Sequence, residues 1–474
     1  MKLIVCVIFL ALFAGCPQLD QMEEARPGLR IMQAVQGGTD FEVRLVDIDP
    51  DMDGLIVYIE NPETDAMIPA RASSNSAAVM VTREGDEFCI TGLPGGMGIV
   101  TFTNTAGTRV GELRVFVRNW KRSEVFRNTL EPDLENYPFD ENDRSLYDPA
   151  NYKNTRWAVY RLITDRGFHY EAPDGLSSRT ADTRTGGGNG TVHGDRVLET
   201  PNRPRHDEPH ILYHYDDFLR KNVFAFAMHF EYDGDMVGGY DDRQRLELKT
   251  MDNTWPPAEF EKPAAERNPE NRMYSNGNGD TFTHRWKFKL PEDFRVSTEF
   301  THIFQLKPEG ADNGNPTMTL TARKRSNNEE VMQLIYRGQI REMIGDREVP
   351  SVNWYPREVP LQAFRGEWVR VEQTVTYDSP GAFRIKVVRI RDMQVLLEWE
   401  YFPEEYNSFR NEDPFVMFRP GNTYIRAKFG FYRRIMHMTP FGLPDPNNPV
   451  LEYLDEGDEV RILYADLEMD KWKN

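Results

Sequence analysis

The chain has 474 residues, with 76 acidic against 57 basic side chains and a formal net charge of -19. This excess of negative charge argues against a general nucleic-acid-binding protein, because a phosphate backbone binds a positive surface. An apolar fraction of 39% and an aromatic fraction of 12% exclude a mostly disordered chain. The length favours two or three folded units.

The first residues, MKLIVCVIFLALFAGC, have the pattern of an export signal. The apolar run is shorter than the ~20 residues of a membrane-spanning helix. Its ending resembles the lipobox of bacterial lipoproteins, in which the cysteine, here Cys16, carries lipid, although Phe13 stands where leucine is usual. We predict a lipoprotein signal over 1–16 and an exported cell-envelope protein that meets the membrane only through its lipid anchor. Secretion after cleavage of a plain signal peptide is the alternative.

Residues 17–28 are polar and are predicted to form a tether. Residues 29–120 then alternate apolar and polar side chains in short runs separated by turn residues, which predicts a small immunoglobulin-like β-sandwich. Nothing in it indicates catalysis, so we expect a spacer or a carbohydrate-binding module. Cys89 is expected to be a small buried apolar residue, and lipid on Cys16 would leave no internal disulfide.

One acidic segment of this region fits the calcium-loop pattern of an EF-hand. Asp49, Asp51, Asp53, Gly54 and Glu60 stand at the ligand positions. The flanking residues, however, alternate like strands rather than helices. We therefore favour an acidic hairpin turn and keep one structural calcium ion as the alternative.

Residues 121–474 are predicted to form a second, larger β domain. The stretch TRWAVYRLIT indicates one helix or strand, and the glycine-rich run at 180–195 has no core-forming residues and is expected to be a loop, either functional or a surface excursion. Many alternating segments follow without a long helical period. The pattern predicts an all-β, concanavalin-like jelly roll of two sheets, and we expect a monomer.

Strand periodicity sorts the side chains of this domain into two faces. In three segments we expect one face to point into the apolar core. The core-facing residues are Leu246 and Leu248 in the first segment, His302, Phe304 and Leu306 in the second, and Ile425, Ala427, Phe429 and Phe431 in the third. The opposite faces carry the side chains Arg243, Arg245, Glu247 and Lys249, then Ile303, Gln305 and Lys307, then Tyr424, Arg426, Lys428, Gly430, Tyr432 and Arg434. Seven of these residues are basic and one is acidic, in a strongly acidic chain. If the strands are neighbours, they form a positive groove for an anionic polysaccharide; a solvated charged surface is the alternative.

The same segments resemble the signature strands of jelly-roll polysaccharide lyases. Arg245-Leu-Glu247-Leu-Lys249, Gln305-Leu-Lys307 and Lys428-Phe-Gly430-Phe-Tyr432 are similar, in order, to the R-x-E-x-R, Q-[IV]-H and Y-x-K-x-G-x-Y-x-Q patterns of family 7 alginate lyases. Related patterns occur in glucuronan lyases and heparinase-like lyases. The resemblance covers about residues 205–470 and none of the N-terminal domain.

This resemblance implies β-elimination on a uronic-acid polysaccharide, without a required cofactor or metal. Gln305 and Arg245 would neutralise the uronate carboxylate, on which charge develops when the C5 proton leaves. Tyr432 would protonate the leaving oxygen and could also take the C5 proton. Glu247 and Lys428 would orient neighbours and bind sugar, with Lys249, Arg243, Arg426, Arg434 and His210 as further binding residues.

The sequence departs from the family pattern where the base is expected. Lys307 replaces the usual histidine, and Arg426 and Arg434 replace the outer tyrosine and glutamine. The base is therefore Lys307, His229 from a neighbouring strand, His210 or Tyr432 alone, whereas His302 is disfavoured by its predicted core position. Alginate, glucuronan, ulvan and glycosaminoglycans all remain candidate polymers.

Other functions fit the residues less well. A glycoside hydrolase needs two carboxylates beside the scissile bond, usually on an E-x-D-x-x-E strand, which we do not find. Nothing indicates a serine or cysteine nucleophile or a zinc site. A non-catalytic, lectin-like surface lipoprotein for anionic polysaccharide is the main alternative. A lectin, however, has no need for Tyr432 beside a carboxylate-binding Gln305.

Overall fold

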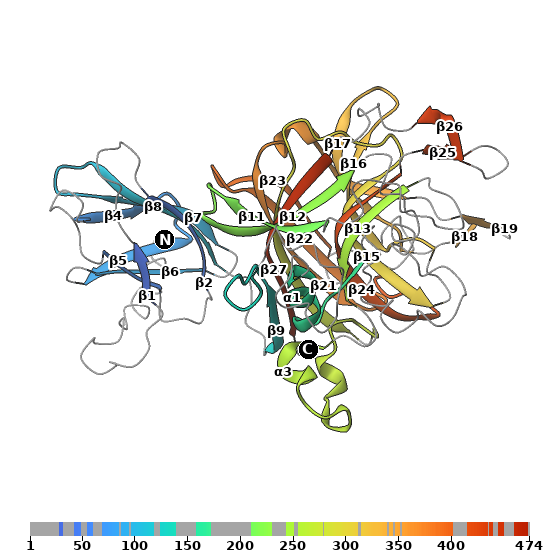
Figure 1. The fold of residues 1–474 in the computed structure, drawn as a ribbon, viewed down its shortest axis with the longest axis horizontal. Coiled ribbons are helices and arrows are strands. Elements are labelled where there is room, and N and C mark those ends of the chain that lie inside the picture. Colours follow the sequence, from blue (N-terminus) through green and yellow to red (C-terminus); the bar gives the residue numbers. More distant parts are fainter. Residues whose placement is uncertain are drawn as a thin grey trace, which may run out of the picture. The chain divides into compact units, whose positions relative to one another are not determined.

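A computed structural model gives the fold of the chain (Figure 1). It describes residues 28–31, 42–48, 55–59, 69–84, 87–93, 96–117, 124–138, 158–171, 210–229, 243–250, 255–277, 279–310, 314–338, 341–344, 347–350, 353–401, 415–434, 436–438, 444–449 and 459–472. The chain divides into two compact units, Met1–Arg122 and Ser123–Asn474. Among the described residues, no helix is long and apolar enough to cross a membrane.

The described residues of the first unit form two sheets. The first sheet has the order β1 (Gly28–Ile31), β3 (Leu55–Ile59), β6 (Glu87–Gly92), β5 (Val79–Glu84). The second has the order β2 (Glu42–Ile48), β8 (Arg109–Val117), β7 (Met97–Thr103), β4 (Arg71–Ser74). Phe88 and Phe102 meet edge to face at 5.2 Å between ring centroids, within the apolar core of this unit. Cys89 is buried, as expected.

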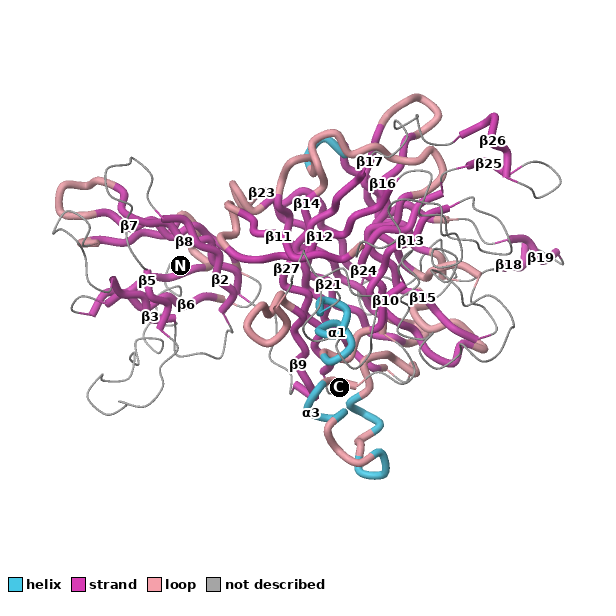
Figure 2. The backbone as a smooth tube through the Cα atoms, in the orientation of Figure 1, coloured by secondary structure: helices cyan, strands magenta, loops and turns pink. Residues whose placement is uncertain are grey.

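The second unit is built from two larger antiparallel sheets, and strands dominate its described residues (Figure 2). The site sheet has the order β10 (His169–Glu171), β13 (Arg243–Lys249), β24 (Asn422–Arg434), β15 (Thr301–Gly310), β16 (Met318–Lys324), β17 (Glu330–Tyr336), β20 (Trp354–Pro360). The back sheet has the order β11 (Ile211–Asp216), β12 (Lys221–His229), β27 (Glu459–Trp472), β14 (Asp280–Lys289), β21 (Trp368–Tyr377), β22 (Ala382–Arg389), β23 (Gln394–Tyr401), and β9 (Glu124–Leu130) also pairs with β27. These sheets confirm the predicted all-β jelly roll.

Short elements complete this unit. The stretch TRWAVYRLIT, expected to be a helix or a strand, contains most of the helix α1 (Ala158–Asp165). The other helical turns are α3 (Pro257–Phe260), η5 (Ala264–Glu266), η6 (Pro269–Asn271) and η7 (Leu361–Ala363). Two hairpins pair β18 (Arg341–Ile344) with β19 (Arg347–Pro350) and β25 (Met436–Met438) with β26 (Pro444–Pro449).

A dense aromatic core joins the two sheets of the second unit. Trp286 on β14 of the back sheet stacks on Phe304 of β15, with ring centroids 4.5 Å apart. It also meets Phe429 of β24 edge to face at 5.4 Å. All three side chains are buried. Aromatic packing of this kind fixes both the spacing and the register of the strands it joins, so the outer faces of β15 and β24 have a rigid support.

Several predictions concern segments outside the described residues. These are the export signal at 1–16 with Cys16, the tether before residue 28, the acidic loop from Asp49 to Glu60 apart from strand β3, and the glycine-rich run at 180–195. They stay predictions.

Candidate functional site

The three segments with charged outer faces are neighbouring strands. β24 lies between β13 and β15 in the site sheet. Arg245 stands opposite Tyr432 and Glu247 opposite Gly430 across one pair, while Gln305 stands opposite Lys428 across the other. Residues that are far apart in sequence therefore share one face, as strand periodicity predicts.

Gly430 allows β13 and β24 to pair closely at the centre of this face. Its φ is 148°, a conformation that side chains rarely adopt. A Cβ at this position would lie 2.3 Å from the carbonyl oxygen of Leu246 and 2.7 Å from Cα of Glu247. The glycine of the sequence motif is thus required by the backbone, and it keeps Glu247 next to β24.

The prediction that His302 lies on the core face is wrong. The register of β15 shifts between His302 and Phe304, which marks a β-bulge at Ile303. Ile303 is fully buried, although strict alternation places it outside. Because the extra residue changes the side-chain phase, His302 lies on the same face as Gln305 rather than opposite to it.

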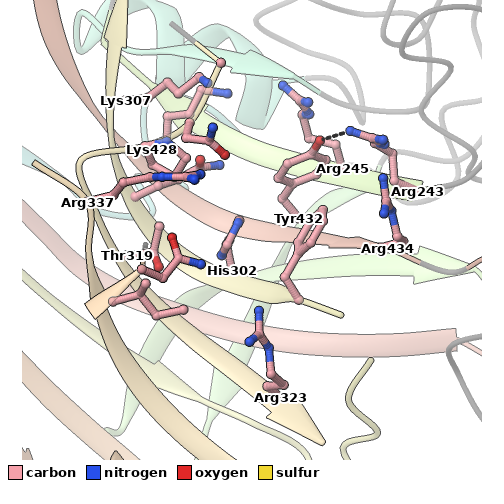
Figure 3. Close-up of a pocket in the computed structure, with 17 residues that line it drawn as sticks. Arg243, Arg245, His302, Lys307, Thr319, Arg323, Arg337, Lys428, Tyr432 and Arg434 are labelled. Carbon is pink, nitrogen blue, oxygen red and sulfur yellow. Dashed lines mark hydrogen bonds between the residues drawn. The ribbon is translucent and has the colours of Figure 1, made fainter. Parts of the chain in front are cut away.

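This face lines a cavity of about 400 Å³ (Figure 3). Seven of the described lining residues are lysine or arginine, and none of them is aspartate or glutamate. The lining consists of Arg243, Arg245, Phe300, His302, Gln305, Lys307, Gly314, Asn315, Pro316, Thr319, Arg323, Ile335, Arg337, Asn353, Lys428, Tyr432 and Arg434. Such a cavity suits an anionic ligand, because cations give charge-assisted hydrogen bonds to carboxylate or sulfate.

Glu247 lies beneath the lining and is 1% exposed. Its Oε1 accepts a hydrogen bond from the side-chain amide of Gln305, and its Oε2 accepts one from Nζ of Lys428 at 2.9 Å. An amide nitrogen carries two protons, so Gln305 can still donate one into the cavity. Glu247 therefore orients two lining residues and is itself outside the cavity.

Tyr432 is held by two arginines of β13. Nη1 of Arg243 donates a hydrogen bond to the Tyr432 hydroxyl oxygen at 2.9 Å, drawn as a dashed line in Figure 3. The guanidinium of Arg245 lies over the Tyr432 ring, 4.1 Å from its centroid. Since the hydroxyl oxygen accepts the bond from Arg243, its own proton can be donated to a ligand.

Two half-buried lining residues have strongly shifted pKa values. Burial and the nearby cations Lys428 and Arg245 lower the pKa of the Lys307 ammonium to about 7. Burial and the positive charges of Arg323 and Lys307 lower the pKa of the His302 imidazole to about 3. Near neutral pH the cavity therefore holds a neutral imidazole and a lysine that is only partly charged.

Other predicted residues lie outside the lining. Lys249 is buried opposite Lys428, and Arg426 forms an ion pair with Glu309. The prediction that His229 comes from a neighbouring strand is wrong, because β12 belongs to the back sheet. His210 precedes β11 of the same back sheet, and its carbonyl accepts a hydrogen bond from the Ala227 amide at 2.8 Å. Both histidines therefore lie on or next to the back sheet. Their placement is set by long-range strand pairing, which local periodicity does not reveal.

Strands β16 and β17 also contribute to the cavity, which strand periodicity in the three motif segments did not predict. Thr319 and Arg323 from β16, and Arg337 just after β17, line the cavity. The signal was present, because Met318, Leu320 and Ala322 are buried and assign the intervening positions to the outer face. Among the described residues no group of three or more His, Cys, Asp or Glu side chains could hold a metal ion.

Comparison with known proteins gives matches only among solved structures. No family model and no curated protein matches the chain. The family 7 alginate lyase A1-II' is 12% identical, with a TM-score of 0.33, over 66% of this chain and 97% of its own. Alginate lyase AlyC3 is 12% identical, with a TM-score of 0.34, over 71% and 99%. The alginate lyase of Klebsiella pneumoniae is 11% identical, with a TM-score of 0.30, over 54% and 83%.

These matches include members of the family that the three strand motifs resemble. At such identities and TM-scores, however, the likeness does not define the chemistry of this chain. We therefore infer its function from the cavity.

Proposed function

We propose that the protein is a polysaccharide lyase that cleaves a uronic-acid polymer by β-elimination. One observation carries the proposal. The hydroxyl of Tyr432 and the amide of Gln305 face a single cavity whose described lining is cationic and lacks carboxylates. A proton donor and a carboxylate-binding group within one positively charged cavity are what this reaction needs.

The reaction begins with a very weakly acidic proton at C5 of a uronate. As this proton leaves, negative charge develops on the adjacent carboxylate, so groups that bind the carboxylate stabilise the transition state. Gln305 and Arg245 are the residues proposed for this task. Glu247 supports it, because its bond to Gln305 fixes the amide before substrate arrives.

The leaving group is the O4 oxygen of the glycosidic bond. The C5–H bonding electrons form a C4=C5 double bond, the C4–O4 bond breaks, and O4 takes a proton from the Tyr432 hydroxyl. No water is consumed and nothing is oxidised or reduced. Arg243, which donates to the Tyr432 oxygen, would stabilise the phenolate that forms.

A glycosidase is disfavoured by the same lining. Hydrolysis with either stereochemistry uses a pair of carboxyl groups beside the scissile bond. The described lining residues supply none, and Glu247 is buried against Gln305 and Lys428. A lectin-like protein would use the cations but not the proton-transfer geometry at Tyr432.

We also propose that the protein acts outside the cytoplasm, where such polymers occur. The export signal predicted at 1–16 supports this location. Labelling of Cys16 with a radioactive fatty acid in a bacterial host, compared with Cys16→Ala, tests the lipid anchor. Equal labelling of the two chains would contradict it.

The function is tested by incubating the purified protein with alginate, glucuronan, ulvan and glycosaminoglycans. We expect ultraviolet absorbance from the conjugated double bond to rise with at least one polymer. Binding of a polymer with no such product from any of them would favour the lectin-like alternative.

A further inference from the structure

We propose that His302 is the base that takes the C5 proton, in place of the histidine that the family pattern has at the position of Lys307. This inference rests on the proposed lyase function. It assigns the role that the sequence left open among Lys307, His229, His210 and Tyr432.

The backbone places His302 in the cavity. The bulge at Ile303 turns the imidazole onto the face of Gln305, and the back sheet supports this bulge. The hydroxyl oxygen of Tyr464 on β27 is 3.3 Å from the Ile303 carbonyl oxygen, and it donates a hydrogen bond to the Gly430 carbonyl at 2.7 Å. One buried side chain therefore contacts both backbone irregularities of the site.

The imidazole is also oriented. Its Nδ1 is 2.8 Å from Oγ1 of Thr321, which is in turn 2.7 Å from Oγ1 of Thr319. With Nδ1–H donating to Thr321, Nε2 is the nitrogen that accepts a proton. Phe300 stacks on the ring at 4.7 Å with an interplanar angle of 15°, which holds its plane.

His302 stands beside the proposed acid. It is the register partner of Tyr432, and the two ring centroids are 5.9 Å apart. In the view of Figure 3 the imidazole lies between Tyr432 and Thr319. In the proposed step Nε2 takes the C5 proton while Tyr432 gives its proton to O4. The imidazolium then loses its proton and Tyr432 regains one through solvent, which restores the starting state.

Burial and the charges around His302 keep it neutral before substrate binds. After burial, Arg323 on β16, Lys307 on β15, and Arg245 and Lys428 on β13 and β24 all lower its pKa, and the titratable Tyr432 is also a neighbour. A bound uronate carboxylate offsets these cations, which raises the proton affinity of the imidazole when the reaction needs it. Lys307 is less suitable in this geometry, because its register partner is Arg426, whereas that of His302 is Tyr432.

The test compares His302→Gln with the wild type on the polymer that gives unsaturated product. Gln keeps hydrogen-bonding groups but cannot act as the base. We expect kcat to fall at least about 100-fold, with KM and the thermal unfolding midpoint little changed. His214→Gln, which changes an exposed histidine on β11, is the matched control and should keep full activity.

A second variant keeps the test decisive if His302→Gln folds poorly. His302→Ala opens space at a half-buried position, so added imidazole should restore part of kcat, whereas Tyr432→Phe should gain nothing from it. Wild-type kcat/KM should also lack an acid limb near pH 7, because His302 is deprotonated well below that pH.

Two results would overturn the inference while leaving the lyase intact. One is His302→Gln with wild-type kcat. The other is an acid limb near pH 7 that disappears in Lys307→Met, which would make Lys307 the base. If the wild type makes no unsaturated product from any polymer, the proposed function and this assignment fail together.

Discussion

The amide of Gln305 on β15 donates a hydrogen bond to Oε1 of Glu247 on β13, and both residues are buried on the two strands that flank β24 in the site sheet. The second oxygen of Glu247 accepts from Lys428 at 2.9 Å. One carboxylate beneath the cavity thus fixes both the proposed carboxylate-binding amide and a central cation. This arrangement separates the residues proposed to bind substrate from a residue that positions them.

Glu247→Ala should destabilise the fold as well as the site. Lys428 is 1% exposed, so the substitution leaves a buried ammonium without this partner. Breaking such a pair costs about 3–5 kcal/mol in the free energy of unfolding. Urea unfolding of the variant and the wild type measures the difference. A loss below about 1 kcal/mol would mean that Lys428 does not depend on Glu247.

Tyr432→Phe should abolish turnover and preserve binding. The variant keeps the ring under Arg245 but lacks the proton that O4 needs, so we expect kcat to fall at least about 100-fold. Equilibrium binding of the polymer should change little. Tyr424→Phe is the control, because Tyr424 is on the same strand but outside the cavity lining. Retained turnover in Tyr432→Phe would remove this residue from its role.

Gly430→Ala should be strongly destabilising. The positive φ and the contact of a Cβ with the Leu246 carbonyl both oppose it, and we expect a loss of about 2 kcal/mol or more in the free energy of unfolding. Gly314→Ala is the control for stability, since its Cβ would have no atom within 4 Å. Equal stability of the two variants would show that β13 and β24 do not need the glycine.

Polymer binding should weaken as pH rises through about 7. Lys307 has a folded-state pKa of about 7, and a bound polyanion favours its charged form, so binding takes up a proton at and above this pH. Calorimetry at pH 8 in buffers of different ionisation enthalpy measures the uptake. Lys307→Met should bind more weakly at pH 6 and lose the proton uptake. Uptake that persists in this variant would assign it to another group.

Lys307 should also make stability depend on pH. Its pKa is lowered on folding from an ordinary value of 10.5. Between about 7 and 10.5 the unfolded chain binds more protons, so this residue increases stability as pH rises across that interval. Urea unfolding at several pH values, with Lys307→Met as reference, measures this term. A free energy of unfolding that rises less with pH in the wild type than in Lys307→Met would contradict this prediction.

Strand periodicity predicted much of the site because it is a local property. Leu246, Leu248, Phe429 and Phe431 are buried as expected, and Tyr432 lies on the opposite face. The same rule, applied to β16, would also have found Arg323. The alternation rule holds wherever a strand stays regular, as β16 does.

The failures come from features that the local sequence does not determine. The bulge at Ile303, whose carbonyl contacts Tyr464 of the other sheet, shifts the side-chain phase of β15, so alternation alone misplaced His302. His229 was assigned to the site as a residue of a neighbouring strand, but pairing with β27 places its strand in the back sheet. Sheet membership is decided by long-range pairing, which a single strand pattern does not contain.

The central claim is that the glycosidic bond breaks by elimination, without water. The most direct measurement is mass spectrometry of oligosaccharides released by the purified protein in water enriched in oxygen-18. The proposed mechanism predicts products that lack the mass of one water relative to hydrolysis products and take up no oxygen-18 beyond the exchange at reducing ends of an uncleaved oligosaccharide. Saturated products with one solvent oxygen for each bond cleaved would contradict it.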